Sequence, residues 1–204
     1  MHLHLVRHGQ TEWNTEQRYQ GQLDSNLTEM GIRQAEGLAG QIQDFQFDGA
    51  YSSSSGRAVN TAKILLNNHS VDAEPVDSVR EINLGIWQAK TRGEIEYNYP
   101  EQFDHFWHQP SKFQIDGAET FKQVQQRAMN FIELQVLKQN YERVLVVSHG
   151  ICIKLMLCAM MNRSVDDIWD LPRMGNCSHS IIQWTGSEYV IEQFAHGLTS
   201  SDTV

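Results

Sequence analysis

The sequence of 204 residues contains little cysteine and little proline, and acidic residues outnumber basic ones. It has three cysteines and four prolines, with 25 acidic residues against 16 lysines and arginines. An odd number of cysteines without a CxxC pair argues against a secreted disulfide scaffold and favours a protein of the reducing cytoplasm. The net charge of −9 argues against a general nucleic-acid or acidic-membrane surface, so any bound anion requires a local cluster of basic groups.

Long hydrophobic runs are also missing. The longest apolar stretch, around 155–161, is far too short to span a bilayer. The N-terminus has only a short apolar run before Arg7 and no basic region ahead of it, so we expect no signal peptide. These features predict a cytoplasmic protein without a membrane or nucleic-acid partner. The length and the hydrophobic content of 40% fit one domain covering residues 1–204.

Strand and helix patterns alternate along most of the chain. Apolar, β-branched runs predict strands at 2–6, 48–53 and 143–148, and a hairpin at 178–184 and 189–195. Apolar residues at helical spacing predict helices at 28–43, 56–68, 92–99, 118–139 and 151–161. Such alternation is typical of an α/β sandwich. The last seven residues are small and polar, and we expect a frayed end.

One block, about 85–117, breaks the alternation. It is rich in aromatic residues and contains two prolines. We interpret it as an inserted cap over one end of the sheet, with its aromatic residues forming a core in preference to a base-stacking platform. Trp87 and Trp107 are its candidates for lining a pocket.

Two predicted strands end in a histidine followed by glycine. Arg7 and His8 follow the first strand, His149 and Gly150 follow the strand at 143–148, and Arg57 begins the helix after the second strand. In open α/β sheets, ligands bind outside the carboxyl ends of the strands. We therefore expect these side chains to converge. A guanidinium group can donate two hydrogen bonds to a pair of phosphate oxygens, and helix N-termini add free N–H groups. The pattern therefore predicts a site for a phosphoryl group.

The histidines of such a site suggest covalent chemistry. Two nearby arginines disfavour protonation of an imidazole, which leaves a lone pair free to attack phosphorus and form a phosphohistidine. The arginines and the second histidine would stabilise the charge on the transferring group. A departing alkoxide also needs a proton, and Glu81, just before the predicted cap, is the best candidate donor.

Five motifs carry a resemblance to a known family. LVRHGQTEWN, LTEMGIRQA, YSSSSGRAVNTA, REINLGIW and VVSHG occur in this order within about residues 2–155. Together they resemble the histidine phosphatase superfamily, in its phosphoglycerate mutase-like branch, and most closely the broad-specificity phosphatases. The resemblance implies a three-layer α/β/α sandwich with a mostly parallel mixed sheet and a small helical cap insertion. It also implies chemistry that uses no metal ion and no cofactor.

The resemblance also assigns roles to residues of this sequence. It implies that His8 is the phosphorylated nucleophile, that Arg7, Arg57 and His149 complete the phosphate pocket, and that Glu81 is the proton donor. Further phosphate or substrate contacts are implied for Asn14, Gln20, Gly21 and the backbone of Gly150.

Two departures from the family pattern bear on function. Mutases of the family carry an adjacent arginine pair in the cap, whereas this cap offers only Lys90, Arg92 and Lys112. That difference favours a phosphatase. Many small phosphatases of the family have Glu-Gly where this chain has Gln88 and Ala89, so we expect a different backbone there, with consequences for cap closure.

Three functions stay open, and the first is favoured: a metal-independent phosphatase acting on a small phosphorylated metabolite. The others are a cofactor-dependent phosphoglycerate mutase and a non-catalytic phosphate- or phosphoprotein-binding module. Pure binding needs no proton donor, which argues against the last. His2, His4 and His8 share one face of a strand by period two, but we favour a metal-free site. A homodimer is compatible with the sequence, which does not specify the oligomeric state.

Overall fold

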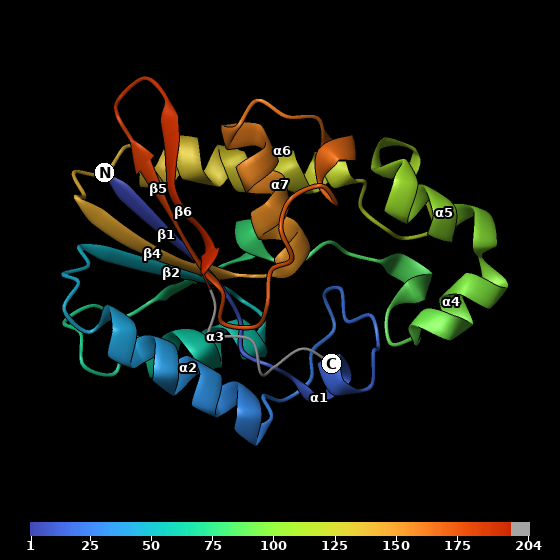
Figure 1. The fold of residues 1–204 in the computed structure, drawn as a ribbon, viewed down its shortest axis with the longest axis horizontal. Coiled ribbons are helices and arrows are strands. Elements are labelled where there is room, and N and C mark those ends of the chain that lie inside the picture. Colours follow the sequence, from blue (N-terminus) through green and yellow to red (C-terminus); the bar gives the residue numbers. More distant parts are fainter. Residues whose placement is uncertain (197–204) are drawn as a thin grey trace.

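A six-stranded mixed sheet forms the centre of the structure, for which the computed structural model describes residues 1–196 (Figure 1). The expected frayed end, 198–204, lies outside the described residues. In spatial order the strands are β3 (Glu74–Val76), β2 (Gly49–Ser53), β4 (Arg143–Ser148), β1 (His2–Arg7), β5 (His179–Trp184) and β6 (Tyr189–His196). The first four pair in parallel and the last two add antiparallel strands at one edge. The predicted hairpin is therefore confirmed.

Helices cover both faces of this sheet. Figure 1 shows α2 (Glu29–Ile42) and α3 (Gly56–Leu65) on one face, with α6 (Phe121–Phe131) and α7 (Gly150–Met160) on the other. The predicted three-layer α/β/α sandwich with a mostly parallel mixed sheet is confirmed. None of the helices in the described part of the chain is long and apolar enough to cross a bilayer.

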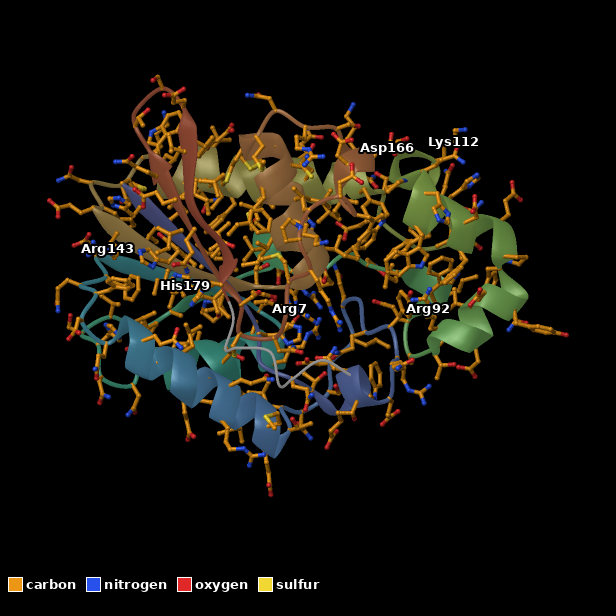
Figure 2. The ribbon with its side chains drawn as sticks, in the orientation of Figure 1. Arg7, Arg92, Lys112, Arg143, Asp166 and His179 are labelled. Atoms are coloured by element: carbon orange, nitrogen blue, oxygen red, sulfur yellow. The ribbon has the colours of Figure 1, made fainter. Side chains whose placement is uncertain are left out.

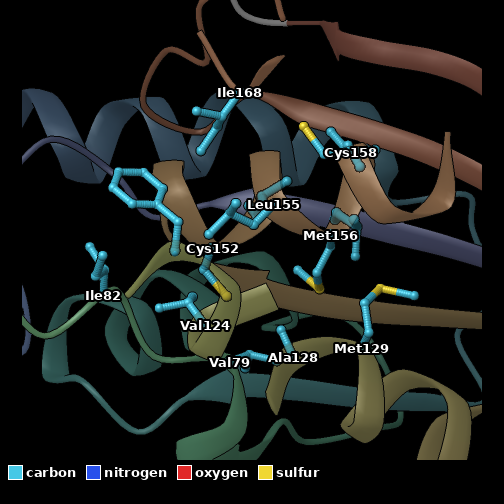
Figure 3. Close-up of a cluster of buried hydrophobic side chains, with 14 of the residues drawn as sticks. Val79, Ile82, Val124, Ala128, Met129, Cys152, Leu155, Met156, Cys158 and Ile168 are labelled. Atoms are coloured by element: carbon cyan, nitrogen blue, oxygen red, sulfur yellow. The ribbon is translucent and has the colours of Figure 1, made fainter. Parts of the chain in front are cut away.

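Alternating side chains of the central strands divide the core into two layers. Leu3 and Leu5 of β1 belong to the cluster on the α6 and α7 side, part of which Figure 3 shows, whereas Val6 belongs to the cluster under α2 and α3. The neighbouring strand β4 alternates in the same way, with Val146 on the first side and Val147 on the second. This is the period-two pattern of strands buried on both faces.

Two helices have boundaries that differ from the prediction. The helix expected over 118–139 begins at Phe121, because Thr120 caps its first turn and exchanges hydrogen bonds with Gln123. Its C-terminal part, Ile132–Val136, continues as a π-helix. The helix predicted over 56–68 ends at Leu65. The apolar periodicity located both helices, whereas the Thr120 cap sets the start of α6 and the change in hydrogen-bond pitch sets its end.

The aromatic block lies beyond the carboxyl ends of the parallel strands (Figure 1). It contains α4 (Arg92–Asn98), α5 (Pro100–His108) and a 3₁₀ turn at Pro110–Lys112. Its aromatic rings continue the core on the α6 and α7 side. Trp87 is fully buried among them, with its ring centroid 5.0 Å from that of Phe113. Trp87 is therefore a core residue and does not line a pocket.

Candidate active site

Four of the predicted residues meet at the carboxyl ends of β1, β2 and β4. Arg7 ends β1 and His8 follows it, His149 lies between β4 and α7, and Arg57 is in the first turn of α3. The rings of His8 and His149 have centroids 5.2 Å apart. Arg7, His8 and Arg57 line a cavity of about 510 Å³ between the sheet and the aromatic block, and Figure 2 shows Arg7 at these strand ends.

His8 is held with one ring nitrogen available. Its Nδ1 lies 2.7 Å from the carbonyl oxygen of Gly9, so Nδ1 carries the proton and Nε2 keeps its lone pair. Burial lowers the pKa of His8 well below its usual value, and the Arg57 and Arg7 cations lower it further. The sequence predicted the effect of the arginines; burial is the larger cause. The imidazole is therefore neutral at physiological pH, as a nucleophile requires.

His149 is fully buried behind His8. Its Nε2 lies 2.7 Å from the hydroxyl oxygen of Ser53. Burial, followed by the Arg57 cation, holds the pKa of His149 well below its usual value. When Ser53 donates to Nε2, the proton of the neutral ring is on Nδ1, which has no partner within residues 1–196.

Both arginines are anchored through their terminal nitrogens. Arg57 Nη1 donates to the Asp24 carboxylate at 2.8 Å, and Nη2 donates to the carbonyl oxygen of Gly21 at 2.8 Å. Arg7 Nη1 donates to the carbonyl oxygen of Met174 at 2.6 Å. The buried Nε of each arginine has no partner among the described residues. Because buried N–H groups are almost always hydrogen-bonded, these two indicate a place for an oxyanion, and His149 Nδ1 adds a third donor when Ser53 donates to its Nε2.

The carboxylate of Glu81 lies against the first turn of α7. One carboxylate oxygen accepts from the backbone N–H of Cys152 and the other from that of Ile151, both at 3.1 Å. The first also accepts from the N–H of Ile82 at 3.0 Å. Glu81 and Gly150 line the cavity together. A carboxyl group is thus fixed at the edge of the same cavity that His8 lines.

The remaining predicted residues lie in the cavity wall but differ in what they contact. Asn14 Oδ1 accepts from the amide of Asn176 at 3.2 Å. The Gln20 amide group donates to Thr11 Oγ1 at 2.7 Å, so Gln20 supports the loop. Gly21 has a φ of 54°, and a side chain there would collide with the amide of Gln88.

The glycine at the start of α7 leaves space for its neighbour. A Cβ atom at Gly150 would lie 3.6 Å from Arg7 Nε. Glycine therefore keeps the unpartnered edge of the guanidinium open.

The cations of the aromatic block are divided between cavity and surface. Arg92 lines the cavity and lies 5.2 Å from the ring centroid of Trp107, which also lines it. Neither Lys90 nor Lys112 is among the lining residues, and Figure 2 shows Lys112 at the top of the block, near Asp166.

The departure at Gln88 and Ala89 leaves the backbone in a glycine-like conformation. Ala89 has a φ of 67°. Its N–H donates to the carbonyl oxygen of Tyr19 at 2.8 Å, and its own carbonyl accepts from Arg18 at 2.5 Å. Thus the left-handed conformation that glycine adopts readily is present here with alanine. The expected difference from the Glu-Gly backbone of other family members stays a prediction.

The histidines on β1 have separate partners. His4 Nδ1 lies 2.9 Å from His179 Nε2, and His2 pairs with Glu192 at 3.5 Å. Within residues 1–196, no group of three or more His, Cys, Asp or Glu side chains is arranged to hold a metal ion.

Several residues of the site were not predicted. Asp24 fixes Arg57, Ser53 contacts His149, and Asn176 donates to the carbonyl oxygen of His8 at 3.1 Å. Lys154, Trp169 and Arg173 also line the cavity. Of these, only Lys154 had a usable signal, because a lysine four residues after Gly150 interrupts an otherwise apolar helix.

Comparison with known proteins decides the family. The family model of the histidine phosphatase superfamily (branch 1) matches residues 3–196. The chain belongs to this superfamily. Its resemblance to the superfamily, inferred above from five motifs, is thereby confirmed.

Similar members of the superfamily have different names. Phosphoserine phosphatase 1 of Hydrogenobacter thermophilus is 33% identical over 92% of this chain and 88% of its own length. A probable phosphoglycerate mutase of Proteus mirabilis is 29% identical over 94% of this chain and 91% of its own. The solved structure of Bacillus stearothermophilus YhfR superposes with a TM-score of 0.91 at 36% identity, covering 94% of this chain and 95% of that one.

Proposed function

We propose that the protein is a metal-independent phosphatase that hydrolyses phosphomonoesters of small metabolites through a phosphohistidine on His8. The observation that carries this proposal is the set of unpartnered nitrogens at the strand ends. Within residues 1–196, Arg7 Nε, Arg57 Nε and His149 Nδ1 are buried without partners, and Nδ1 is a donor in the tautomer in which Ser53 donates to Nε2. They lie beside a neutral imidazole with a free Nε2. Donors for an oxyanion and a nucleophile for its phosphorus therefore share one place.

The first half of the reaction forms the covalent intermediate. The phosphoryl oxygens accept hydrogen bonds from Arg7, Arg57 and His149, and His8 Nε2 attacks phosphorus on the side opposite the ester oxygen. The N–P bond forms as the P–O ester bond breaks, and the leaving alkoxide takes its proton from Glu81. The products are an alcohol and phospho-His8.

The second half returns the enzyme to its starting state. Glu81, now ionised, accepts a proton from a water that attacks the phosphorus of phospho-His8. The N–P bond breaks, inorganic phosphate leaves, and His8 is again neutral. The positive charge of two guanidinium groups supplies the stabilisation that a divalent ion supplies in metallophosphatases.

The surrounding features fit this proposal. We assign the role of a cap to the block at 85–117, which encloses the cavity through Arg92 and Trp107. Asn14, Gly21 and Gly150 border the phosphoryl site, and Gln20 holds the loop beside it. The three cysteines are unpaired and buried, which fits a protein of the reducing cytoplasm. The substrate is the only partner that the proposal requires, and it needs neither nucleic acid, membrane nor a second copy in a homodimer.

The decisive test compares two histidine-to-alanine variants. His8→Ala should abolish hydrolysis of an aryl phosphate and leave the melting temperature close to that of the wild type. His108→Ala, on the exposed surface of α5, is the matched control and should retain full activity. Activity of His8→Ala within tenfold of wild type would remove His8 from the nucleophile role. Wild-type protein that binds phosphate without turnover would instead be a binding module.

A phosphoglycerate mutase is the second candidate, favoured by the relative from Proteus mirabilis. A mutase must protect phospho-His8 from water while the substrate turns over. The assay supplies 3-phosphoglycerate with catalytic 2,3-bisphosphoglycerate and follows isomer and free phosphate together. We expect phosphate release to dominate, because this cap lacks the adjacent arginine pair. Isomerisation that is tenfold faster than phosphate release would establish the mutase instead.

A further inference from the structure

A buried ammonium group lies in the cavity wall beyond the phosphoryl site. Lys154 is 7% exposed and lines the cavity together with Gly150 and Ile151. Residues three and four apart share one face of a helix, and four residues advance about 6 Å along its axis. Lys154 is therefore on the same face as the residues at the start of α7 and one turn further along the helix, with its ammonium beside Trp169.

This ammonium is held in place, but its charge is not neutralised. Lys154 Nζ donates to the carbonyl oxygen of Ile168 at 3.3 Å and to that of Leu171 at 3.1 Å. An ammonium has three N–H donors, so one is left for a ligand. No carboxylate forms an ion pair with it in the described part of the chain. Burial lowers the pKa of Lys154, and the Arg7 cation lowers it further.

Two tryptophans form a wall beside the ammonium. Lys154 Nζ lies 5.2 Å from the ring centroid of Trp169, whose own centroid is 4.4 Å from that of Trp107. Trp169 Nε1 donates to the carbonyl oxygen of Phe106 at 2.6 Å. This tryptophan wall, Trp107 and Trp169, is thus fixed both to α7 and to α5, and it offers an apolar surface to a carbon skeleton next to a cation.

Other cations line the same cavity, but their settings differ. Arg18 pairs with Glu16 at 2.9 Å, and Arg92 is exposed and lies over Trp107. Arg173 is exposed, so water screens its charge. Apart from Arg7 and Arg57 of the phosphoryl site, Lys154 is the cation of this lining that is largely removed from water, where an anionic partner is worth most.

We propose that Lys154 is a specificity-determining residue that binds a carboxylate on the leaving group of the substrate, with the tryptophan wall enclosing the carbon skeleton. The inference rests on the proposed phosphatase function. An unneutralised buried cation is unfavourable, and an anionic ligand relieves it. One remaining N–H suits a carboxylate oxygen, whereas a second phosphate dianion would require several donors.

The test uses two ligands that differ at one group. 3-Phosphoglycerate carries a carboxylate where glycerol 3-phosphate carries a hydroxymethyl group. Binding is measured by calorimetry in the His8→Ala background, where no turnover is expected. We expect 3-phosphoglycerate to bind roughly 10- to 100-fold more tightly, the range of a hydrogen bond to a charged group. Adding Lys154→Met should remove this preference by weakening 3-phosphoglycerate alone, with the affinity for inorganic phosphate unchanged.

Three further variants make the test specific. Lys154→Gln removes the charge but keeps N–H donors for the two carbonyl oxygens. It should therefore fold even if Lys154→Met fails to fold, and it should also lose the preference for 3-phosphoglycerate. Lys112→Met removes the same charge outside the cavity and should change nothing. Arg173→Met should retain the preference.

Two results would overturn the inference. Equal weakening of both ligands and of inorganic phosphate by Lys154→Met and Lys154→Gln would make Lys154 a structural anchor. A preference that survives at Lys154 and is lost in Arg173→Met would assign the carboxylate to the exposed arginine. Failure of the wild type to hydrolyse an aryl phosphate or either ester would refute the phosphatase function, while the binding comparison would still decide the role of Lys154.

Discussion

Replacing Ala89 with glycine should stabilise the protein. Ala89 has a φ of 67°, and its N–H and carbonyl groups are both hydrogen-bonded, so the backbone cannot easily leave this conformation. The left-handed region costs an L-residue about 1–2 kcal/mol, and glycine loses about 0.5–1 kcal/mol more chain entropy on folding. The difference predicts a gain of about 0.5–1 kcal/mol for Ala89→Gly, which corresponds to roughly 1–4 °C in melting temperature for a chain of this size.

The matched control is the same substitution in a helix. Ala39 lies within α2, where glycine should destabilise the protein by about 1 kcal/mol. Both variants are compared with the wild type by urea denaturation, with equal slopes required before the midpoints are converted to free energies. The change from alanine to glycine should thus raise the free energy of unfolding at residue 89 and lower it at residue 39. If Ala89→Gly were destabilising to the same extent as Ala39→Gly, residue 89 would not have a left-handed backbone in solution.

Three further predictions concern chemistry and pH. Glu81→Gln should slow hydrolysis of an alkyl phosphate about 10²- to 10⁴-fold and that of nitrophenyl phosphate far less, because only the alkoxide needs a proton; equal losses would contradict a donor role. Dialysis against EDTA should leave activity unchanged, and activity that returned only with added zinc, magnesium or manganese would refute the metal-free mechanism. Burial lowers the pKa of His4 to about 3 and that of His179 to about 4. The unfolded chain therefore binds more protons below about pH 6.5, and stability should fall with falling pH by at most about 1.4 kcal/mol per unit for each histidine. In urea titrations between pH 6.5 and 4, His4→Phe should show a shallower fall, and an unchanged slope would contradict this assignment.

The fold was predictable where local patterns and burial agree. Leu3, Leu5 and Val6 show that β1 is apolar on both faces, as a strand covered by two helical layers must be. The end of α6 was not predictable in the same way. Phe131 and Ile132 keep the apolar periodicity, but the backbone changes from α to π hydrogen bonding between them. The side-chain pattern carries no signal for that change.

The residues of the candidate site also fall into a predictable group and an unpredictable group. Arg7, His8 and His149 follow directly from strand ends, and the order of strands in an α/β sheet brings such ends together without any knowledge of side-chain contacts. Asp24 and Asn176 come from loops whose positions depend on the finished tertiary structure. No strand end or helical spacing in their sequence neighbourhoods connects them to Arg57 or His8.

The cavity has one group of residues for the phosphoryl group and another for the rest of the substrate. In the proposed mechanism, Arg7, Arg57 and His8 surround the phosphoryl group that every phosphomonoester shares, so this part of the site cannot distinguish one substrate from another. Selectivity must then come from residues that contact the rest of the molecule, for which we propose Lys154 on α7 and Trp169 on the segment after it. Because Trp169 donates to Phe106 in α5, a change in the aromatic block would move the wall without moving the phosphoryl site. Substitutions in the aromatic block should therefore alter the choice of ester far more than the affinity for inorganic phosphate.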